Sequence, residues 1–432
     1  MTKTSIGVDF GTSNTVVSVA TGDGEVKTLR FPHGDAAPTV YPSALCFWQQ
    51  RRGLPAQAEG GSWAFERVLE HHGAMRFLQS FKTLAASRSF QSTAIFGQRF
   101  QFEDVLAAFL RTLARHAGSQ IDLAGARVTV GRPVRFAGAA PDEALAMQRY
   151  RDGFARLGVA DATYVYEPVG AAFSFARGLE RDATVLVADF GGGTSDFSLM
   201  RFARGERGVT AEPLGHSGVG VAGDSFDYRI VEKVVSPRLG KGGSYRSTFG
   251  KTLPIPSHYY AKLARWHELA LMKGGADMRE LRELARDALD PEPLEAFIEI
   301  VEHDLGLSLY RAVAAAKMAL SSAERVEFRF ADMDIEIGAT IARADFEGWI
   351  AEDLAAIAAA VDQVLREAGV GAAGVDKVFL TGGTSFVPAV QRLFVERFGA
   401  GKLSSADQFE SISRGLALIG RSEEPGRWAV AG

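Results

Sequence analysis

The sequence has 432 residues, more than one ordinary hydrophobic core holds, so we expect two lobes. Its 48 basic and 52 acidic side chains leave a net charge of −4, which gives no overall field to attract nucleic acid or an anionic membrane. The single cysteine, Cys46, cannot form an internal disulfide, and the first ten residues lack the charged-then-apolar order of a signal peptide. The most apolar helical stretch, residues 354–365, is too short to span a bilayer. We therefore expect a cytoplasmic protein that binds neither nucleic acid nor membrane.

The chain opens with a motif that returns later. Residues 6–15 read IGVDFGTSNT, with an apolar strand, an acid at its end, a glycine turn and hydroxyl residues that lead into a second strand. Residues 187–196 read VADFGGGTSD, and Asp189 follows Asp9 by 180 positions (189 − 9). One Asp-Phe-Gly string is a weak signal, but two in matching strand and turn contexts are strong. Both segments are predicted to be β-hairpins.

The composition of these hairpins indicates phosphate binding. We expect glycine at the turns because they need positive φ, and because a missing Cβ lets backbone N–H groups approach phosphate oxygens. Charge-assisted hydrogen bonds of about 1.5–3 kcal/mol each could then hold a triphosphate between the hairpins. Asp9 and Asp189 would face the phosphates, which requires a cation between them. Mg²⁺, which keeps several of its waters, suits that place.

Between the hairpins the order of elements is mixed α/β. Residues 102–117 have the pattern of an amphipathic helix, and residues 127–130 and 163–167 that of buried strands. Pro168 suits the first turn of a further helix. Residues 170–172 (GAA) leave that helix a nearly bare face, where a second helix could cross closely. We interpret it as a hinge helix.

Beyond the first hinge helix we place a lobe boundary near Arg181. Residues 236–258 carry four basic residues and no acid, and predict a flexible basic loop, most simply a solvated surface insertion. Residues 259–323 are helical in pattern. A strand at residues 378–380 then meets Gly382 and Gly383, a third strand-to-glycine junction, and residues 411–420 resemble the earlier hinge helix.

Several other interpretations of these motifs fail. Protein kinases also use Asp-Phe-Gly, but the chain lacks their His-Arg-Asp loop and Val-Ala-Ile-Lys strand. The G-x-G-x-x-G string at residues 218–223 is not preceded by a buried strand pattern, so we expect a plain glycine turn. A P-loop at residues 250–252 would need glycine where Tyr245 stands. The histidines have no metal-site spacing, and Lys82 taken alone predicts only a solvated surface charge.

Together the motifs resemble the ATPase domain of the DnaK-type heat-shock chaperones, within the actin-like (ribonuclease H-like) superfold. The resemblance is carried, in family order, by the two hairpins and Lys82 and by residues 165–172 (VYEPVGAA), 220–227 (GVAGDSFD), 316–322 (AKMALSS) and 380–384 (LTGGT). The pattern is most similar to the short branch typified by YegD, which lacks the peptide-binding domain. The resemblance implies a duplicated two-lobe α/β fold, with lobe I at residues 1–181, lobe II at 182–403 with an insertion-rich tip at 236–305, and a hinge helix and tail at 404–432 that pack toward lobe I.

The resemblance also implies roles for individual residues. Asp9 and Asp189 would hold hydrated Mg²⁺, and Lys82, Glu167, Thr194 and Asp196 would serve hydrolysis, with Lys82 neutralising the γ-phosphate and the two acids orienting water. The phosphates of ATP or ADP would be bound by Gly11, Thr12, Ser13, Asn14, Gly191, Gly192, Gly193 and Thr194. The nucleoside would be bound by Lys317, Met318, Ser321, Gly382, Gly383 and Phe386.

The chain departs from the family pattern in two places. Met318 and Phe386 stand where the family has arginines that sandwich adenine, and Ala314 stands where it has an acid. A Met and Phe slot can still stack on a purine, so we expect adenine binding with altered nucleobase preference or affinity. After Ala417 only 15 residues remain, so we expect no peptide-binding domain.

These features predict a slow, Mg²⁺-dependent ATPase that acts as a chaperone-like nucleotide switch, read by a separate partner or client protein. Two alternatives stay open. A small-molecule kinase of the same superfold would add an acceptor pocket with a carboxylate base. A filament-forming relative of MreB or actin would polymerise with ATP.

Overall fold

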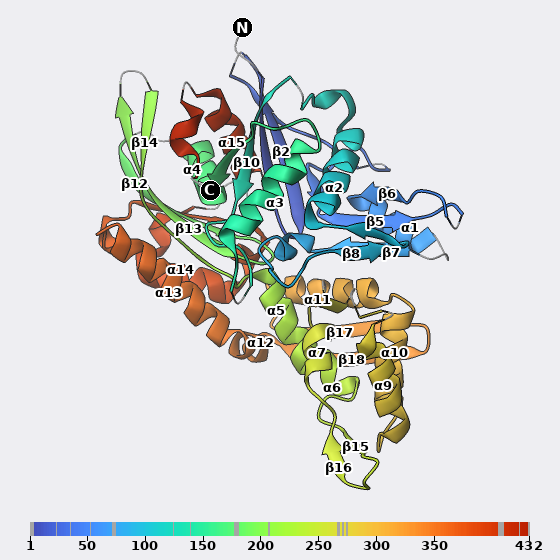
Figure 1. Ribbon diagram of the computed structural model, residues 1–432. Coiled ribbons are helices and arrows are strands. Elements are labelled where there is room, and N and C mark those ends of the chain that lie inside the picture. The colour runs from blue at the N-terminus through green and yellow to red at the C-terminus, as the bar shows by residue number, and fades with distance from the viewer. Residues whose placement is uncertain are drawn as a thin grey trace. The chain divides into compact units, whose positions relative to one another are not determined.

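The computed structural model describes residues 4–430 except 23, 35, 52, 71–74, 124, 139, 177–180, 206–207, 266–267, 270–271, 274, 405–409 and 423. By the density of its internal contacts the chain separates into two units (Figure 1). Unit 1 comprises Met1–Gly223, Ala355–Ser385 and Val390–Gly432, and unit 2 comprises Asp224–Leu354 and Phe386–Ala389. The predicted lobes at residues 1–181 and 182–403 stay a prediction.

Unit 1 alternates strands and helices, as the sequence predicts. Its first half contains β1 (Ser5–Phe10), β2 (Asn14–Ala20), β3 (Val26–Thr28), β4 (Val40–Pro42), β5 (Ala44–Trp48), β6 (Gln57–Gly60), α1 (Ser62–Glu70), β7 (Met75–Gln79), η1 (Phe81–Leu84), β8 (Thr93–Ile95), β9 (Gln98–Phe100), α2 (Phe102–Ala117), β10 (Arg127–Arg132), α3 (Glu143–Ala155), β11 (Thr163–Tyr166) and α4 (Glu167–Ala176). Its second half contains β12 (Ala183–Phe190), β13 (Ser195–Gly205), β14 (Gly208–Val219), most of α13 (Ala351–Glu367), β19 (Lys377–Thr381), most of α14 (Pro388–Phe398), β20 (Leu403–Ser404), α15 (Ser411–Arg421) and the short η7 (Pro425–Trp428).

Two sheets of unit 1 have the same topology. The first has the order β3-β2-β1-β10-β11, with β4 also on β2, and the second has the order β14-β13-β12-β19-β20. In each sheet the first three strands of this order are antiparallel and the last two continue in parallel. The registers correspond as well, because Phe10 faces Thr15 across one hairpin and Phe190 faces Ser195 across the other. Both predicted hairpins, and the duplicated α/β architecture, are therefore confirmed.

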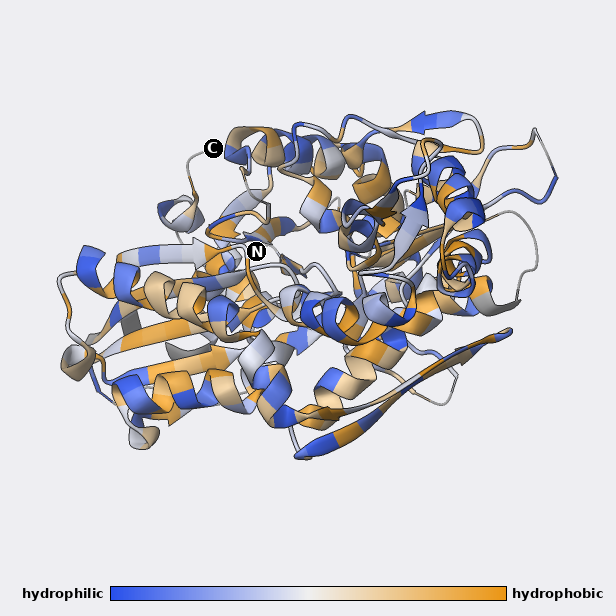
Figure 2. Cartoon of the chain, turned by 90° about the horizontal axis from the view of Figure 1, so that it is seen from below, coloured by the Kyte–Doolittle hydropathy of each residue, from blue (hydrophilic) through white to orange (hydrophobic). Residues whose placement is uncertain are grey.

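The strands that carry the acids lie inside their sheets. Nearly every residue of β1 and β12 is buried, because each strand has sheet partners on both edges and helices against it. Such strands have continuous apolar runs, and Figure 2 shows some strands coloured as hydrophobic along much of their length, whereas other strands and the helices alternate between polar and apolar residues. Each run ends at a carboxylate, so the acids stand at the edge of a rigid core.

Helices α4 and α15 pack against each other with backbone contact. A Cβ at Gly415 would lie 1.7 Å from the carbonyl oxygen of Gly170, so neither helix could carry a larger side chain at the crossing. Helix α15 also rests on β1, where a Cβ at Gly7 would lie 2.1 Å from the Ser413 carbonyl oxygen. Helix α4 in turn contacts β12 and β13. The bare helix face predicted at residues 170–172 is therefore a close helix crossing that joins the two sheets.

The G-x-G-x-x-G segment follows a strand, but not one of the kind that a dinucleotide site needs. The residues before it do form a strand, β14, which leads into α5 (Gly223–Ile230). However, β14 is a half-exposed edge strand that pairs only antiparallel to β13, whereas a dinucleotide fold needs a buried parallel strand there. The strand before the glycines is therefore not buried, as the sequence analysis expected, and the dinucleotide interpretation stays rejected.

Unit 2 is mainly helical. After α5 it contains a π-helical segment (Val231–Val235), α6 (Ser236–Arg238), β15 (Ser244–Arg246), β16 (Thr252–Pro254), α7 (His258–Leu263), α9 (Ala276–Asp287), α10 (Glu292–Glu302), α11 (Gly306–Leu320), β17 (Arg325–Asp332), β18 (Ile335–Ala342) and α12 (Arg343–Trp349). The predicted flexible loop at residues 236–258 is instead a helical turn followed by the β15–β16 hairpin. The backbone of Ser244 is also bound by the amide of Leu289, at 2.9 Å. None of the described helices is both long and apolar enough for a membrane span.

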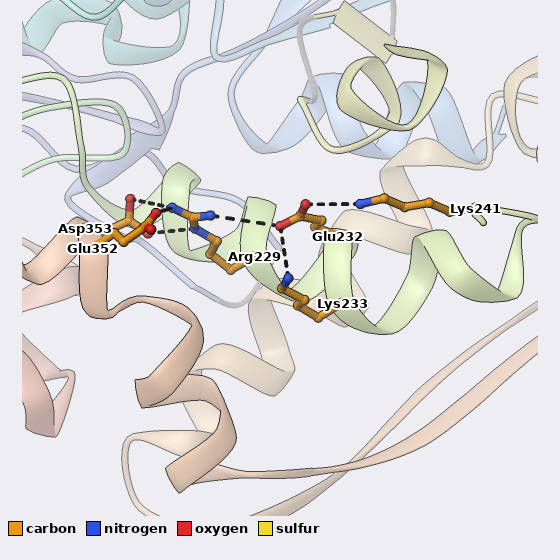
Figure 3. Close-up of polar contacts among 6 residues, drawn as sticks. All are labelled: Arg229, Glu232, Lys233, Lys241, Glu352 and Asp353. Atoms are coloured by element: carbon orange, nitrogen blue, oxygen red, sulfur yellow. Dashed lines mark hydrogen bonds and ion pairs between the residues drawn. The ribbon is translucent and has the colours of Figure 1, made fainter. Parts of the chain in front are cut away.

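An ion-pair network ties α5 to the start of α13 inside unit 2 (Figure 3). Arg229 Nε donates to Asp353 Oδ2 at 2.9 Å, and its guanidinium also approaches Glu352 and Glu232. Lys241 Nζ donates to Glu232 at 3.0 Å. Asp353 lies in the first turn of α13, where a carboxylate also interacts favourably with the helix dipole. The network therefore fixes the end of α5 and the π-helical segment.

The crossing of α4 and α15 gives a stability prediction. Gly415→Ala places a methyl group inside the backbone of α4, and we expect the unfolding free energy to fall by about 1–3 kcal/mol through overpacking. Urea denaturation measures this change. Gly348→Ala on helix α12 is the matched control, since its Cβ meets no atom within 4 Å and alanine favours a helix. Equal stability of the two variants would contradict the described crossing.

Candidate functional site

The two hairpin turns are built in the same way. The amide of Gly11 donates to the Asn14 carbonyl at 2.9 Å, and the amide of Gly191 donates to the Thr194 carbonyl at 2.9 Å. The expected positive φ is wrong, because Gly11, Gly191, Gly192 and Gly193 all have negative φ. Gly11 is needed for space instead, since a Cβ there would lie 2.4 Å from the Asn14 carbonyl oxygen. The turns are tight through close backbone approach and not through a left-handed residue.

The loops of the two hairpins face each other. A Cβ built on Gly193 would lie 3.3 Å from Thr12 Oγ1, in the opposite loop. It would also lie 3.5 Å from the side chains of Thr83 and Ala137. The space beside Gly193 is thus bordered by hydroxyl-bearing residues and by the turn that carries Lys82. The structure brings together the two loops that the sequence predicts to bind phosphate.

The two strand-end acids are buried close to each other. Burial raises the pKa of Asp9 well above its usual value, and the negative charges of Glu167 and Asp189 raise it further. Burial and the charge of Glu167 likewise raise the pKa of Asp189, whose Oδ1 accepts a hydrogen bond from Thr381 at 2.9 Å. Carboxylates in this state require a cation to remain charged at neutral pH.

Lys82 forms a buried ion pair with Glu167. Its Nζ lies 2.7 Å from Glu167 Oε1, and Lys82 is 6% exposed, so it is not the solvated surface charge that its sequence context alone suggests. Burial by itself lowers the pKa of Lys82, but the carboxylate of Glu167 more than offsets this, and the pKa is raised. The lysine is therefore a permanent cation beside the two hairpins. Gly131 makes room for Glu167, because a Cβ there would lie 2.9 Å from Glu167 Cγ.

Asp196 is held by backbone amides and has one unsatisfied oxygen. Its Oδ1 accepts from the amides of Val134 at 2.7 Å and Arg135 at 3.2 Å. Its Oδ2 is buried and has no hydrogen-bond partner among the described residues. Burial and the charge of Glu167 raise the pKa of Asp196 well above its usual value. Across the sheet a Cβ at Gly218 would lie 2.6 Å from Asp196 Oδ1, so only glycine leaves space for this carboxylate.

The charge balance of the site fits a hydrated divalent cation. Three buried carboxylates, on Glu167, Asp189 and Asp196, and the half-buried carboxylate of Asp9 lie near a single lysine, Lys82, and Asp196 Oδ2 lacks a partner among the described residues. Oxygen ligands suit Mg²⁺, which keeps several waters and binds proteins through one or two carboxylates. Among the described residues no three acidic, histidine or cysteine side chains come together with metal-ligand spacing. The acids therefore suit an ion bound through water and one or two carboxylates.

Among the residues predicted to bind the nucleoside, Lys317, Met318 and Ser321 lie at the C-terminal end of α11. Phe386 lies in the second segment of unit 2. Lys317 Nζ is 2.8 Å from Asp227 Oδ2, so this lysine is paired inside unit 2. Ser321 follows the last turn of α11. Met318 is 71% exposed and Phe386 is 48% exposed, unusual values for large apolar side chains. Both are accessible to a ligand.

Gly382 and Gly383 have different roles. Gly382 has a φ of +83°, and a Cβ there would lie 2.0 Å from the Phe190 carbonyl oxygen. The nearby backbone of β12 therefore requires glycine at position 382, independently of any contact with a ligand. Gly383 has no heavy atom within 4 Å of a built Cβ, and its surroundings are open.

Some site residues escaped the sequence analysis. The amides of Val134 and Arg135 hold Asp196, but backbone donors leave no signal in side-chain identity. Thr381 holds Asp189, and it could have been found because it stands one position before Gly382 at the end of a predicted strand. Gly218 was interpreted as a plain turn, yet its role is to leave space for Asp196.

Comparison with known proteins agrees with this architecture. The model of the Hsp70 protein family matches residues 71–241 and 300–426. The chain belongs to the Hsp70 family. Its fold is therefore the actin-like two-lobe ATPase fold, and the matched residues include Lys82, Glu167 and the second hairpin. The first hairpin precedes them, so its correspondence rests on the duplicated topology and register described above.

One curated relative shows the extent of the similarity. The chain is 23% identical over 429 residues to the chaperone protein DnaK of Thermus thermophilus, an alignment that covers 96% of this chain and 60% of that relative. The chain thus spans about three fifths of the length of this member of the Hsp70 family. Assignment to the YegD-like branch stays a prediction.

The space around Asp196 gives the second prediction. Gly218→Ala forces the Asp196 carboxylate away from the amides of Val134 and Arg135, and we expect ATP hydrolysis to slow by about tenfold or more. Single-turnover hydrolysis measures the rate, and urea denaturation shows whether the variant is folded. Gly220→Ala is the control, since its Cβ would meet the nearest atom at an ordinary 3.5 Å. A normal rate in Gly218→Ala would show that the position of Asp196 is unimportant.

Proposed function

We propose that the chain binds ATP with Mg²⁺ and hydrolyses it slowly, as a chaperone-like nucleotide switch. The observation that carries this proposal is the meeting of the two hairpin loops with Lys82 and four acids, of which three are buried and Asp9 is half-buried, at one site. A metal-bound polyphosphate matches both parts of this arrangement, because it presents negative oxygens to the loops and a cation to the acids. Membership of the Hsp70 family supports the same proposal.

The loops would bind phosphate through the backbone and hydroxyl groups. Residues 11–14 and 191–194 would donate from both sides of the space beside Gly193, where a side chain would interfere. Each such bond to a charged oxygen contributes about 1.5–3 kcal/mol. Two loops are needed because a single hairpin turn offers too few donors to hold a triphosphate in one orientation.

Hydrolysis would depend on positioning and charge. Asp9 and Asp189 would hold hydrated Mg²⁺, which when bound neutralises phosphate charge. Lys82 would place its fixed positive charge at the γ-phosphate, while Glu167 keeps the ammonium group in place. Asp196, with its free Oδ2, would accept a hydrogen bond from the attacking water and orient it. No group here is a strong base, which is why we propose a slow reaction.

The two alternatives are less well supported. A small-molecule kinase needs an acceptor carboxylate beyond those that hold Mg²⁺, Lys82 and water, and the buried acids described here already have such roles. A filament-forming protein would share the hairpins, but the family match at residues 71–241 and 300–426 favours the chaperone branch. As a switch, the protein would need a partner that distinguishes the ATP and ADP states. We propose a separate cytoplasmic reader or client protein for this role.

Lys82 tests the proposed activity. We expect Mg²⁺-dependent release of phosphate from ATP by the wild type, and a decrease of about a hundredfold or more in Lys82→Ala because a charge at the transition state is lost. Glu167 is then left without its partner, so circular dichroism must confirm folding. Lys251→Ala, an exposed lysine, is the control. Transfer of labelled phosphate to a metabolite instead of water would favour the kinase alternative, and ATP-dependent sedimentation the filament.

The nucleobase slot is the more specific part of the proposal. Met318 and Phe386 both belong to unit 2, and each exposes a large apolar surface that a purine ring could cover. Stacking and thioether contacts do not read the hydrogen-bonding edge of a base. We therefore propose that the slot grips adenine without strong discrimination against other purines.

Phe386→Ala tests this slot. We expect ATP affinity, measured by titration calorimetry, to fall by about tenfold, since base stacking on an aromatic contributes about 1–3 kcal/mol. Phe249→Ala removes a phenylalanine that is 90% exposed elsewhere in unit 2 and serves as the control. Unchanged ATP affinity in Phe386→Ala would remove this residue from the slot.

A further inference from the structure

Arg149, in the middle of helix α3, binds a run of backbone carbonyls. Its Nη1 donates to the carbonyl oxygens of Leu84 at 2.9 Å, Ala85 at 2.8 Å and Ser87 at 3.1 Å. Its Nη2 donates to the carbonyl oxygen of Phe90 at 2.5 Å. One guanidinium thus gathers four carbonyls from a segment of seven residues, and the planar fork of arginine is suited to such multiple donation.

Burial of the Arg149 guanidinium costs hydration energy, which other contacts must offset. None of the ion pairs among the described residues includes Arg149, and burial lowers its pKa. A partly buried cation loses hydration energy, which its hydrogen bonds and the more distant charges of Glu103 and Asp142 offset. The four carbonyls gain a charged donor in turn, although the Leu84 carbonyl also accepts from the amide of Ser87 at 3.2 Å. The guanidinium is therefore a device that holds this segment of backbone.

The segment held by Arg149 continues directly from the turn that carries Lys82. Lys82 lies in η1 (Phe81–Leu84), and its carbonyl oxygen accepts from the amide of Ala85 at 3.0 Å. Arg149 binds the carbonyl of that same Ala85. The turn begins at Ser80, whose φ of 52° is left-handed and strained for a residue with a side chain. A turn that starts with strain needs an external contact to keep one conformation.

The next residue of α3 shows that this helix lies against the ion pair itself. Tyr150 is fully buried, with its ring 5.9 Å from that of Phe10 in the first hairpin. Burial raises the pKa of Tyr150, and the positive charge of Lys82 partly opposes this shift, so the phenol and the ammonium are near each other. Consecutive residues of α3 therefore contact the Lys82 turn and border the Lys82–Glu167 pair.

We propose that Arg149 is a positioning residue for Lys82, which fixes the turn at residues 81–90 so that the ammonium group stays buried against Glu167. Its effect on ATP hydrolysis rests on the proposed function, because it acts only through Lys82. Its effect on the burial of Lys82 does not depend on any activity. The two effects can therefore be measured separately.

The first experiment measures the burial of Lys82 directly. Wild type, Arg149→Ala, Arg149→Lys and Arg151→Ala are treated with acetic anhydride, and the acetylation rate of Lys82 is followed by mass spectrometry without nucleotide. We expect Lys82 to react about tenfold or more faster in Arg149→Ala, because its turn opens locally. Arg149→Lys, which restores one charged donor, should lie between. Arg151→Ala, on the exposed side of the same helix, should match the wild type.

The second experiment asks whether Arg149 acts through Lys82. A double-mutant cycle compares kcat for ATP and the affinity for ADP in Arg149→Ala, Lys82→Ala and the double variant. We expect Arg149→Ala to lower kcat by about ten- to a hundredfold, as a displaced catalytic group does, with ADP affinity nearly unchanged. The double variant should be no slower than Lys82→Ala alone. A merely structural role would lower ADP affinity and kcat together.

Each outcome decides between specific claims. Equal acetylation of Lys82 in the wild type and Arg149→Ala, in folded protein, would overturn the proposal, as would losses of kcat that multiply in the double variant. If Lys82→Ala hydrolyses ATP normally, the proposed function of Lys82 fails, while faster acetylation in Arg149→Ala would still establish that Arg149 buries this lysine. If Arg149→Ala does not fold, the Arg149→Lys variant answers both questions.

Discussion

The structure depends on three buried carboxylates and the half-buried Asp9, which gather around a single lysine. Burial and the nearby charge of Glu167 raise the pKa values of Asp9, Asp189 and Asp196, and the charge of Lys82 partly opposes this shift at Asp9 and Asp189. Burial of unpaired charge is costly, so such an arrangement is maintained where a cation binds. The core that surrounds the acids, the glycines that give them space and the loops that face them all serve this one requirement.

The duplicated sheets position the acids and the loops around this site. Two sheets of equal topology each end in a hairpin, and the crossing of α4 and α15 at Gly170 and Gly415 connects them. Because these helices touch through backbone, a small rotation at the crossing shifts strands on both sides without a soft side-chain layer to absorb it. Under the proposed function, this contact is a physical basis on which hydrolysis at the loops would shift one sheet relative to the other. Helix α3, through Arg149, plays a local part by fixing the turn that carries Lys82.

The sequence predicted the fold well because both hairpins repeat a pattern with a mechanism. Strand ends, acids and turn glycines are local features, and the 180-residue repeat made chance unlikely as an explanation. The predictions from sequence were wrong where tertiary contacts determine the local structure. The glycines of the turns serve close approach and not positive φ, and the basic segment at residues 236–258 contains a hairpin. Nothing near Lys82 in sequence indicates its partner 85 residues away, nor that Val134 and Arg135 hold Asp196 through their amides.

The account stands on one claim, that the two hairpin loops bind the same metal-bound polyphosphate. The most direct measurement is a crystal structure of the protein with Mg²⁺ and ADP or a non-hydrolysable ATP analogue. The account predicts phosphate oxygens within hydrogen-bond distance of residues 11–14 and 191–194 at once, with the cation reached by Asp9 or Asp189. A nucleotide bound to one loop alone, or at another place on the chain, would contradict it.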